Sequence, residues 1–143
     1  YAAGSISKRL RIPEGEKLRR PIVEFYYKSD ALGDPLLTED HIEILDLASQ
    51  EEVELLKTKA LEVNKVLTEL FAELGVKLID FKLEFGRDSQ GNVLLADEIS
   101  PDTCRLWDME TNEKLDKDVF RRDLGSLTEA YAAILARLGV QSC

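Results

Sequence analysis

The sequence predicts an α+β domain in which a largely antiparallel sheet is flanked by helices. Residues 49–75 have the spacing of a long amphipathic helix. Residues 76–85 and 93–99 alternate as strands do, and the polar stretch RDSQGN between them suits a hairpin loop. Residues 126–139 form a second amphipathic segment. Strands joined by a short loop pair antiparallel, and 143 residues with 44% hydrophobic content suffice for one domain with its own core.

The first half of the chain predicts short elements. Residues 2–10 favour a helix, which the turn-forming stretch Pro-Glu-Gly ends. Residues 21–28, PIVEFYYK, alternate and are rich in aromatic and β-branched residues, so they predict a strand. A loop follows over 29–35. Thr38 is placed to cap a short helix over 40–45.

The two long helices carry start and stop signals. Ser49 with Glu52 forms a capping box, and Gly75 ends the first helix. Ser126 with Glu129 opens the second helix. The predicted buried positions of the first are Val53, Leu56, Ala60, Val63, Leu67, Leu70, Phe71 and Leu74. Those of the second, which Gly139 closes, are Leu127, Tyr131, Ile134, Leu135 and Leu138.

Charge and composition exclude some classes of protein. A formal net charge of −9 argues against a nucleic-acid partner. No run of about 18 apolar residues predicts a membrane span. Cys104 and Cys143 lie far apart without metal-ligand spacing, which favours a reduced, cytoplasmic protein.

The positive charge is concentrated at one end. Residues 1–20 carry a net charge of +4, which leaves −13 for the rest of the chain. This basic end is either a solvated surface or a local anion site on an acidic body. The basic residues are Lys8, Arg9, Arg11, Lys17, Arg19 and Arg20, against Glu14 and Glu16.

Residues 78–86, LIDFKLEFG, carry the most unusual pattern. Alternation along a strand would place Asp80, Lys82 and Glu84 on one face. The opposite face would then be apolar throughout: Ile79, Phe81, Leu83 and Phe85. A charged strand face is often only a solvent-exposed one, since antiparallel sheets commonly leave one face wet.

The hairpin partner adds further acid. Its sequence VLLADEIS ends in Asp97 and Glu98, and either of these faces Glu84 across the hairpin. Like charges opposite one another are destabilising, and Lys82 alone is too little for three acids. A bound Mg²⁺ would compensate, because this ion takes one or two carboxylates together with nucleotide phosphates and water. Spacing leaves open whether Asp97 or Glu98 is the ligand.

Several further blocks accompany this motif in order. They are AAGS at 2–5 followed by KRL, KSDALGDP at 28–35, ADEISPDTCRLWD at 96–108 and DKDVFRRDLG at 116–125. Together with LIDFKLEFG they resemble the phosphoribosylaminoimidazole-succinocarboxamide synthase (SAICAR synthetase) family. The resemblance runs over essentially all 143 residues.

The resemblance implies a carbon–nitrogen ligase of de novo purine (IMP) biosynthesis. Members of the family join L-aspartate to the carboxylate of 5-amino-1-(5-phospho-D-ribosyl)imidazole-4-carboxylate (CAIR), with ATP and Mg²⁺. ATP converts the carboxylate to an acyl phosphate, the amine of aspartate displaces phosphate, and the products are SAICAR, ADP and phosphate. Such chemistry depends on positioning and charge neutralisation, so a chain with one His suffices.

The resemblance also assigns residues. Glu84 and Asp97 are the expected contacts to ATP-bound Mg²⁺, and Asp80 and Lys82 the expected catalytic pair beside the reacting carboxylate and phosphoryl group. Five residues are expected to bind substrate: Ser5, Lys28, Asp34, Asp102 and Arg105.

Two of these have a physical rationale for holding the 5′-phosphate. Ser5 would open a helix, whose N–H groups favour an anion, and Arg105 could grip a phosphate bidentately. The residues alone leave plainer alternatives: Ser5 as a simple cap, and Arg105 paired with Asp108.

The sequence departs from the family in one respect. Family chains begin with a β-rich lobe that carries lysine contacts to the nucleotide, followed by an Arg, before the AAGS block. Residues 1–143 contain neither. They are expected to form a single substrate- and metal-binding lobe that resembles the C-terminal lobe of this ATP-grasp-like fold, with the N-terminal nucleotide lobe absent. This lobe is expected to have little ligase activity of its own. An apolar surface left bare there would favour a homo-oligomer. The rival hypotheses are a non-catalytic ribonucleotide-binding fragment and a structural α+β module.

Overall fold

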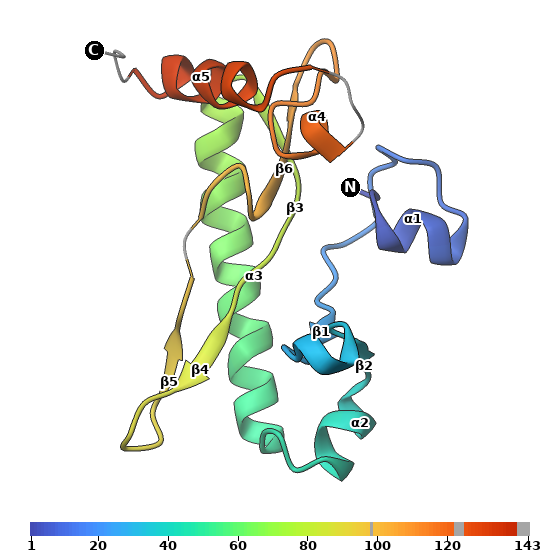
Figure 1. Ribbon diagram of the computed structural model, residues 1–143, viewed down its shortest axis with the longest axis vertical. Coiled ribbons are helices and arrows are strands. Elements are labelled where there is room, and N and C mark those ends of the chain that lie inside the picture. The colour runs from blue at the N-terminus through green and yellow to red at the C-terminus, as the bar shows by residue number, and fades with distance from the viewer. Residues whose placement is uncertain (98, 122–124, 140–143) are drawn as a thin grey trace. The chain divides into compact units, whose positions relative to one another are not determined.

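The computed structural model describes residues 1–97, 99–121 and 125–139, without the side chains of residues 120 and 121 (Figure 1). The chain divides into two compact units. Unit 1 comprises Tyr1–Arg19 and Lys65–Cys143, and unit 2 comprises Arg20–Asn64. Strands in the described residues form three two-stranded antiparallel sheets, which confirms the predicted α+β class with antiparallel pairing. No helix in these residues is long and apolar enough to cross a membrane.

Unit 2 contains the short elements. β1 (Phe25–Tyr26) pairs with β2 (Leu36–Leu37), and α2 (Glu39–Ile44) follows. The predicted strand over 21–28 is therefore reduced to two residues. The cap of α2 is as predicted: the Thr38 hydroxyl accepts from the N–H of His41 (3.2 Å), and His41 Nδ1 accepts from the N–H of Thr38 (3.1 Å).

The long helix α3 (Gln50–Glu73) begins where the capping box predicts. The Ser49 hydroxyl accepts from the N–H of Glu52 (3.1 Å), whose carboxylate accepts from the N–H of Ser49 (3.0 Å). Val53 and Phe71 on the predicted stripe are buried. Leu70 is 43% exposed, so its placement on that stripe is wrong.

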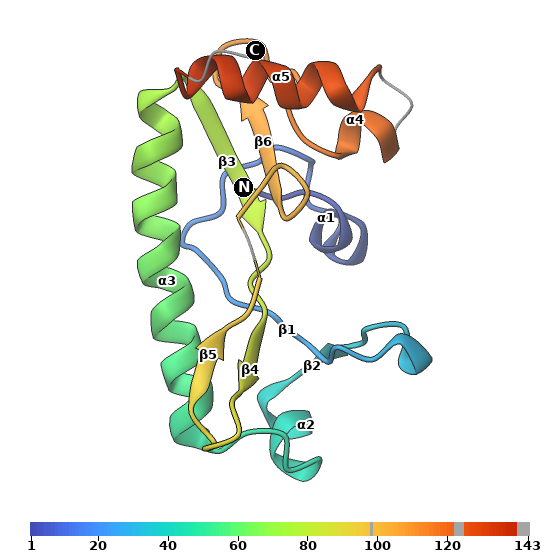
Figure 2. The same ribbon diagram turned by 60° about the vertical axis from the view of Figure 1, so that its left-hand side comes forward.

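The core of unit 1 lies around the antiparallel pair β3 (Val76–Phe81) and β6 (Cys104–Asp108). The C-terminal end of α3 and helix α5 (Leu127–Arg137) pack against this pair (Figure 2). Between β6 and α5 lies α4 (Asp118–Arg121). The buried cluster consists of Phe71, Val76, Leu78, Cys104, Leu106, Leu115 and Ile134.

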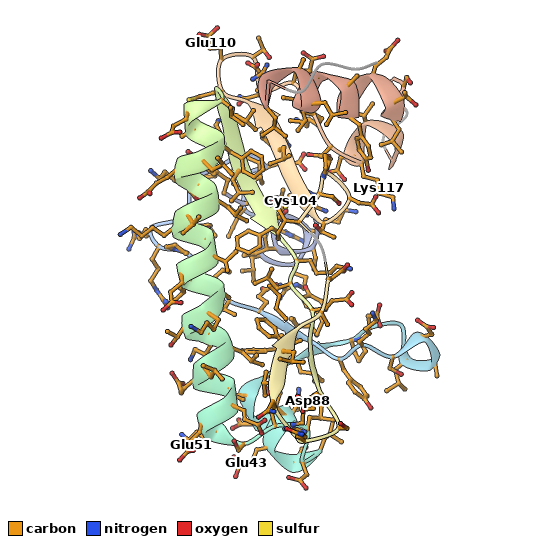
Figure 3. All side chains as sticks on the ribbon, turned by 90° about the vertical axis from the view of Figure 1, so that its left-hand side faces the viewer. Glu43, Glu51, Asp88, Cys104, Glu110 and Lys117 are labelled. Atoms are coloured by element: carbon orange, nitrogen blue, oxygen red, sulfur yellow. The ribbon has the colours of Figure 1, made fainter. Side chains whose placement is uncertain are left out.

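The predicted strand over 76–85 is two strands. β3 ends at Phe81, and β4 (Phe85–Arg87) pairs with β5 (Val93–Leu95) in a separate hairpin, so β5 stops short of residue 99. Asp88 lies at the turn of this hairpin (Figure 3), where its carboxylate accepts from the N–H groups of Gln90 (2.9 Å) and Asn92 (2.8 Å). The partner of β3 is β6, a strand that the sequence analysis did not predict.

A register shift between Leu78 and Asp80 breaks the simple alternation. Phe81 packs in the same cluster as Leu78, whereas Ile79 packs with Trp107 and Ala3. The prediction that Ile79 and Phe81 share a face is therefore wrong, because a bulge turns the side chains that follow it.

The helices of unit 1 differ from the prediction at their ends. α1 (Ser5–Leu10) begins later than residue 2, and Ala2 and Ala3 are buried residues that precede the helix. In α5 the Ser126 hydroxyl accepts from the N–H of Glu129 (3.5 Å), and Ile134 is buried as predicted. Leu135 and Leu138 are each 45% exposed, so their inward placement is wrong.

Arg137 joins three elements of unit 1. Its guanidinium donates to the carbonyl oxygens of Leu74 (3.4 Å) and Gly75 (3.0 Å), just beyond α3. It also forms a short ion pair with Asp108, the last residue of β6. This contact ties α5 to α3 and β6.

Replacing Asp108 by Asn should lower the free energy of unfolding at pH 7, because the charged contact with Arg137 is lost. Hydrogen bonds from Arg137 and from the N–H groups of Thr111 and Glu110 hold the pKa of Asp108 below its ordinary value. Such a carboxyl contributes stability above its unfolded pKa of about 3.9 and loses it as pH falls through the folded pKa. Urea titrations should therefore show the wild-type advantage shrinking between pH 7 and about 2. An advantage equal at both ends of this range would contradict the assignment.

Candidate functional site

Arg105 on β6 is the centre of the charged cluster in unit 1. Its Nη1 lies 2.7 Å from Asp80 Oδ2 on β3, and its Nε lies 2.8 Å from Asp118 Oδ2 at the start of α4. Asp80 and Arg105 face one another in the β3–β6 ladder. The alternative that Arg105 pairs with Asp108 is wrong, because Asp108 lies against Arg137.

The flanking carboxylates fix the charge of this arginine. Burial alone would lower the pKa of the Arg105 guanidinium, but Asp80 and Asp118 outweigh it and raise the pKa. Burial raises the pKa of the Asp80 carboxyl, and Arg105 opposes that rise. Arg105 is thus a permanent cation held between two acids, and Asp80 takes a proton more readily than an ordinary aspartate.

The backbone of α1 comes close to the same guanidinium. Gly4, the N-cap of α1, has φ +60° and ψ −127°, a conformation that side chains rarely adopt. A Cβ built on Gly4 would lie 2.5 Å from Nη2 of Arg105. Only glycine therefore satisfies both the turn and the packing against the arginine.

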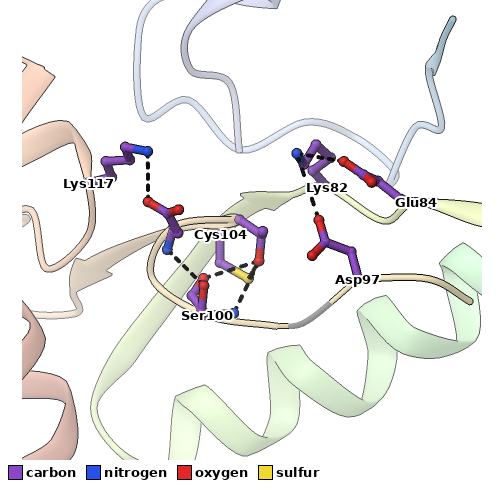
Figure 4. Close-up of polar contacts among 8 residues, drawn as sticks. Lys82, Glu84, Asp97, Ser100, Cys104 and Lys117 are labelled. Carbon is purple, nitrogen blue, oxygen red and sulfur yellow. Dashed lines mark hydrogen bonds and ion pairs between the residues drawn. The ribbon is translucent and has the colours of Figure 1, made fainter. Parts of the chain in front are cut away.

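Lys82 lies in a second charged group, between β3 and β4. Its Nζ is 3.0 Å from Glu84 Oε1 and 3.9 Å from Asp97 Oδ2 (Figure 4). The backbone N–H of Ala96 donates to the carbonyl of Glu84 (2.8 Å), which brings the segment before Asp97 alongside. The predicted association of Glu84, Lys82 and Asp97 is therefore present in the structure.

The donor set of this group fits a magnesium ion delivered with a nucleotide. Glu84 and Asp97 converge on one cationic atom, so both carboxylates face a common point that holds positive charge. Mg²⁺ binds typically through one or two carboxylates, with phosphates and water completing its octahedron. Among the described residues no group of three or more His, Cys, Asp or Glu forms an all-protein metal site. Glu98, the alternative ligand, lies outside the described residues.

Comparisons with known proteins show which family the chain belongs to. Residues 1–138 match the family model described as SAICAR synthetase. The chain is 66% identical over 137 residues to the phosphoribosylaminoimidazole-succinocarboxamide synthase of Lysinibacillus sphaericus strain C3-41, and 67% identical to that of Bacillus subtilis strain 168. The chain belongs to the SAICAR synthetase family.

Solved structures of the family give the same result. A SAICAR synthetase (Type-2) in complex with ADP superposes with a TM-score of 0.93 at 50% identity, and the Ehrlichia chaffeensis enzyme with 0.92 at 48%. Each match covers 99% of this chain but 61% of the solved one. The two bacterial relatives are likewise covered over 58% and 57% of their lengths, against 96% of this chain. The chain thus spans about three fifths of a SAICAR synthetase.

The other expected substrate contacts of the SAICAR synthetase family have their own local partners. Asp102 forms an ion pair with Lys117 (2.9 Å) and accepts from the hydroxyl of Tyr131 (3.2 Å). Ser5 accepts from Arg9 Nε (3.0 Å) and is not the cap of α1, a role that Gly4 takes. The cap alternative for Ser5 is therefore wrong.

Lys28 and Asp34 belong to unit 2. They flank the loop between β1 and β2, where the carboxylate of Asp34 accepts from the N–H of Ser29 (2.8 Å). Tyr27 and Pro35 close the same loop through a backbone hydrogen bond of 3.0 Å. The loop brings Lys28 and Asp34 near one another within their unit.

Sequence reasoning missed the acids that support Arg105. Asp116 and Asp118 are both buried, although aspartate is rarely buried unless it is paired. They belong to the block DKDVFRRDLG, which the resemblance singled out without giving its acids a role. Their signal in the sequence was the spacing of two acids, two residues apart, at the start of that block.

Cys104 is not a nucleophile in this site. Its side chain is buried in the β3–β6 core (Figure 3), and burial raises the pKa of the thiol to about 11. A thiol with this raised pKa is protonated at neutral pH.

Replacing Gly4 by Ala should displace the guanidinium of Arg105 and weaken the binding of the phosphate that the family resemblance assigns to this arginine. The new Cβ would clash with Arg105, and the backbone conformation of Gly4 would add roughly 1–3 kcal/mol of strain. Calorimetric titration and thermal unfolding would measure the two effects. Gly91→Ala is the control, because Gly91 also has a positive φ (+81°) but open space around it. Unchanged ligand affinity in the Gly4 variant would contradict the packing argument.

Proposed function

We propose that this chain is the ribonucleotide- and metal-binding part of an enzyme that ligates L-aspartate to CAIR with ATP and Mg²⁺. One observation carries the proposal: the β3–β6 pair brings Asp80 and Arg105 together, and the segments after β3 and β5 bring Lys82, Glu84 and Asp97 together. These are residues that the family resemblance had assigned from sequence. A solved SAICAR synthetase in complex with ADP supports the use of a nucleotide by the family.

The reaction is a carbon–nitrogen ligation in two steps. An oxygen of the CAIR carboxylate attacks the γ-phosphorus of ATP, ADP leaves, and an acyl phosphate remains. The nitrogen of aspartate then attacks the acyl carbon, the bond from that carbon to the phosphate oxygen breaks, and the amine loses a proton. The products are SAICAR, ADP and inorganic phosphate, within purine biosynthesis.

The residues of the site supply charge and position for these steps. Lys82 carries positive charge beside Glu84 and Asp97, where it stabilises negative charge developing on the transferred phosphoryl group. Arg105 supplies planar N–H donors for the ribonucleotide phosphate, and Asp80 lies against it at the substrate side. Bound Mg²⁺ would be held by Glu84 and Asp97 and would neutralise charge on the ATP phosphates.

A second candidate is a ribonucleotide-binding chain without turnover. The chain spans 57–61% of the related chains that it matches, so binding and turnover are separate questions for residues 1–143. Binding of CAIR with no release of ADP in the presence of ATP and aspartate would support this candidate over the ligase.

Glu84→Gln and Asp97→Asn should each raise the Mg²⁺ concentration needed for half-maximal activity and lower kcat in a ligase that contains these 143 residues. Each variant removes one of two carboxylates that converge on the metal position, and metal affinity depends on ligand charge. Coupled measurement of ADP release over a Mg²⁺ series would report both effects. Asp88→Asn, at the turn of the same hairpin, serves as control. Wild-type Mg²⁺ dependence in both variants would rule out the metal assignment.

Arg105→Lys should weaken CAIR more than tenfold while leaving ATP affinity unchanged. Lysine keeps the charge between Asp80 and Asp118 but loses the fork that binds phosphate, and a charged hydrogen bond contributes about 1.5–3 kcal/mol. Arg137→Lys is the matched control, because Arg137 also pairs with an aspartate of unit 1. Equal weakening of CAIR and ATP would mean that Arg105 holds the fold or the nucleotide.

A further inference from the structure

The two acids that hold Arg105 differ in their surroundings. The side chain of Asp118 is 4% exposed, whereas that of Asp80 is 39% exposed. Asp118 accepts a hydrogen bond from Nε, which lies close to the aliphatic stem of the arginine. Asp80 accepts one from Nη1, at the far end of the guanidinium. A ligand can replace the more exposed partner on Nη1 more easily than the buried partner on Nε.

Asp118 is itself held in place by Asp116. The carboxylate of Asp116 accepts from the N–H of Asp118 (2.7 Å) and from the N–H of Leu106 (2.6 Å). Leu106 is the neighbour of Arg105 on β6, so Asp116 links the strand that carries the arginine to the helix that carries its partner. Asp116 is 1% exposed, and such a buried, hydrogen-bonded acid forms a rigid support.

Fixing Nε fixes the plane of the guanidinium. The five N–H donors of arginine have a rigid planar arrangement, so one bond at Nε together with the stem sets the directions of the Nη hydrogens. Nη2 lies against the Gly4 turn, which prevents the group from tilting that way. The Nη edge is therefore presented in one orientation, with Asp80 on its more exposed side.

We propose that Asp118 is a positioning residue, which holds Arg105 by Nε so that the Nη edge binds an anionic group, and that Asp80 is the partner displaced by that anion. The identity of the anion as the phosphate of CAIR rests on the proposed function. Asp80 is suited to displacement because its side chain is 39% exposed, whereas that of Asp118 is 4% exposed. Asp118 is assigned a role through its contact with Arg105 and no contact with substrate.

Nitrogen-detected NMR of the wild-type chain tests the division between the two acids. Addition of CAIR should shift the Nη resonances of Arg105, whereas its Nε–H signal should keep its position and its protection from exchange. Loss or movement of the Nε–H signal, with the Nη signals unchanged, would overturn the proposal.

Variants test the role of Asp118 separately from folding. Asp118→Ala should lose the protected Nε–H signal and weaken CAIR about tenfold or more, whereas Asp118→Asn should retain both, since its amide oxygen still accepts the Nε hydrogen. Asp80→Asn should keep the Nε–H signal. Asp108→Ala is the matched control, because it removes the aspartate partner of a different arginine in unit 1, Arg137. It should leave the affinity for CAIR unchanged.

The outcomes separate this inference from the proposed function. Failure of the wild-type chain to bind CAIR would overturn the proposed function, and the Nε–H signals of the Asp118 variants would still decide whether Asp118 fixes Arg105. Binding of CAIR by wild type with equal affinity in Asp118→Ala and Asp108→Ala would overturn the inference alone. An Asn variant as impaired as the Ala variant would also overturn it, because charge and not position would then be the contribution of Asp118.

Discussion

The ion pairs of Arg105 are the interaction on which the described part of unit 1 depends most. One guanidinium joins β6 to β3 through Asp80 and to α4 through Asp118, with the Gly4 turn against it. Of the two acids Asp118 is buried, and removing it would leave the charge of Arg105 without its buried partner. The same side chain is also the cation that an anionic substrate would meet. Arg105 therefore serves both the stability of unit 1 and the recognition of substrate, so few substitutions at this position would preserve both.

Local signals predicted the parts of the fold that local chemistry determines. The cap of α2 at Thr38 and the capping box of α3 at Ser49 are present, because a cap needs only residues a few positions apart. The grouping of Glu84, Lys82 and Asp97 was also predictable, since a short hairpin brings its two ends together. The family resemblance assigned Asp80 to catalysis and Arg105 to the ribonucleotide, and the β3–β6 register places the two residues opposite one another.

Features set by contacts far along the chain could not be predicted in this way. The bulge after Leu78 depends on the register of β3 with β6, and no sequence pattern within residues 76–85 predicts it. The pairing of Arg105 with Asp118 depends on the turn held by Asp116, whose carboxylate reaches the N–H of Leu106 ten residues earlier. Leu135 and Leu138 also depend on tertiary packing. Their helical spacing predicts an apolar face, but only contacts with other elements decide whether that face is buried.

A crystal structure of the chain with CAIR and Mg-ADP would test the central claim most directly. The account predicts a phosphate oxygen of CAIR within hydrogen-bond distance of the Nη edge of Arg105, Asp118 still on Nε, and Mg²⁺ bound by Glu84 and Asp97. It also predicts that Lys82 will have moved away from the position that the metal takes. A ribonucleotide bound elsewhere, with the pair of Arg105 and Asp80 intact, would contradict the account.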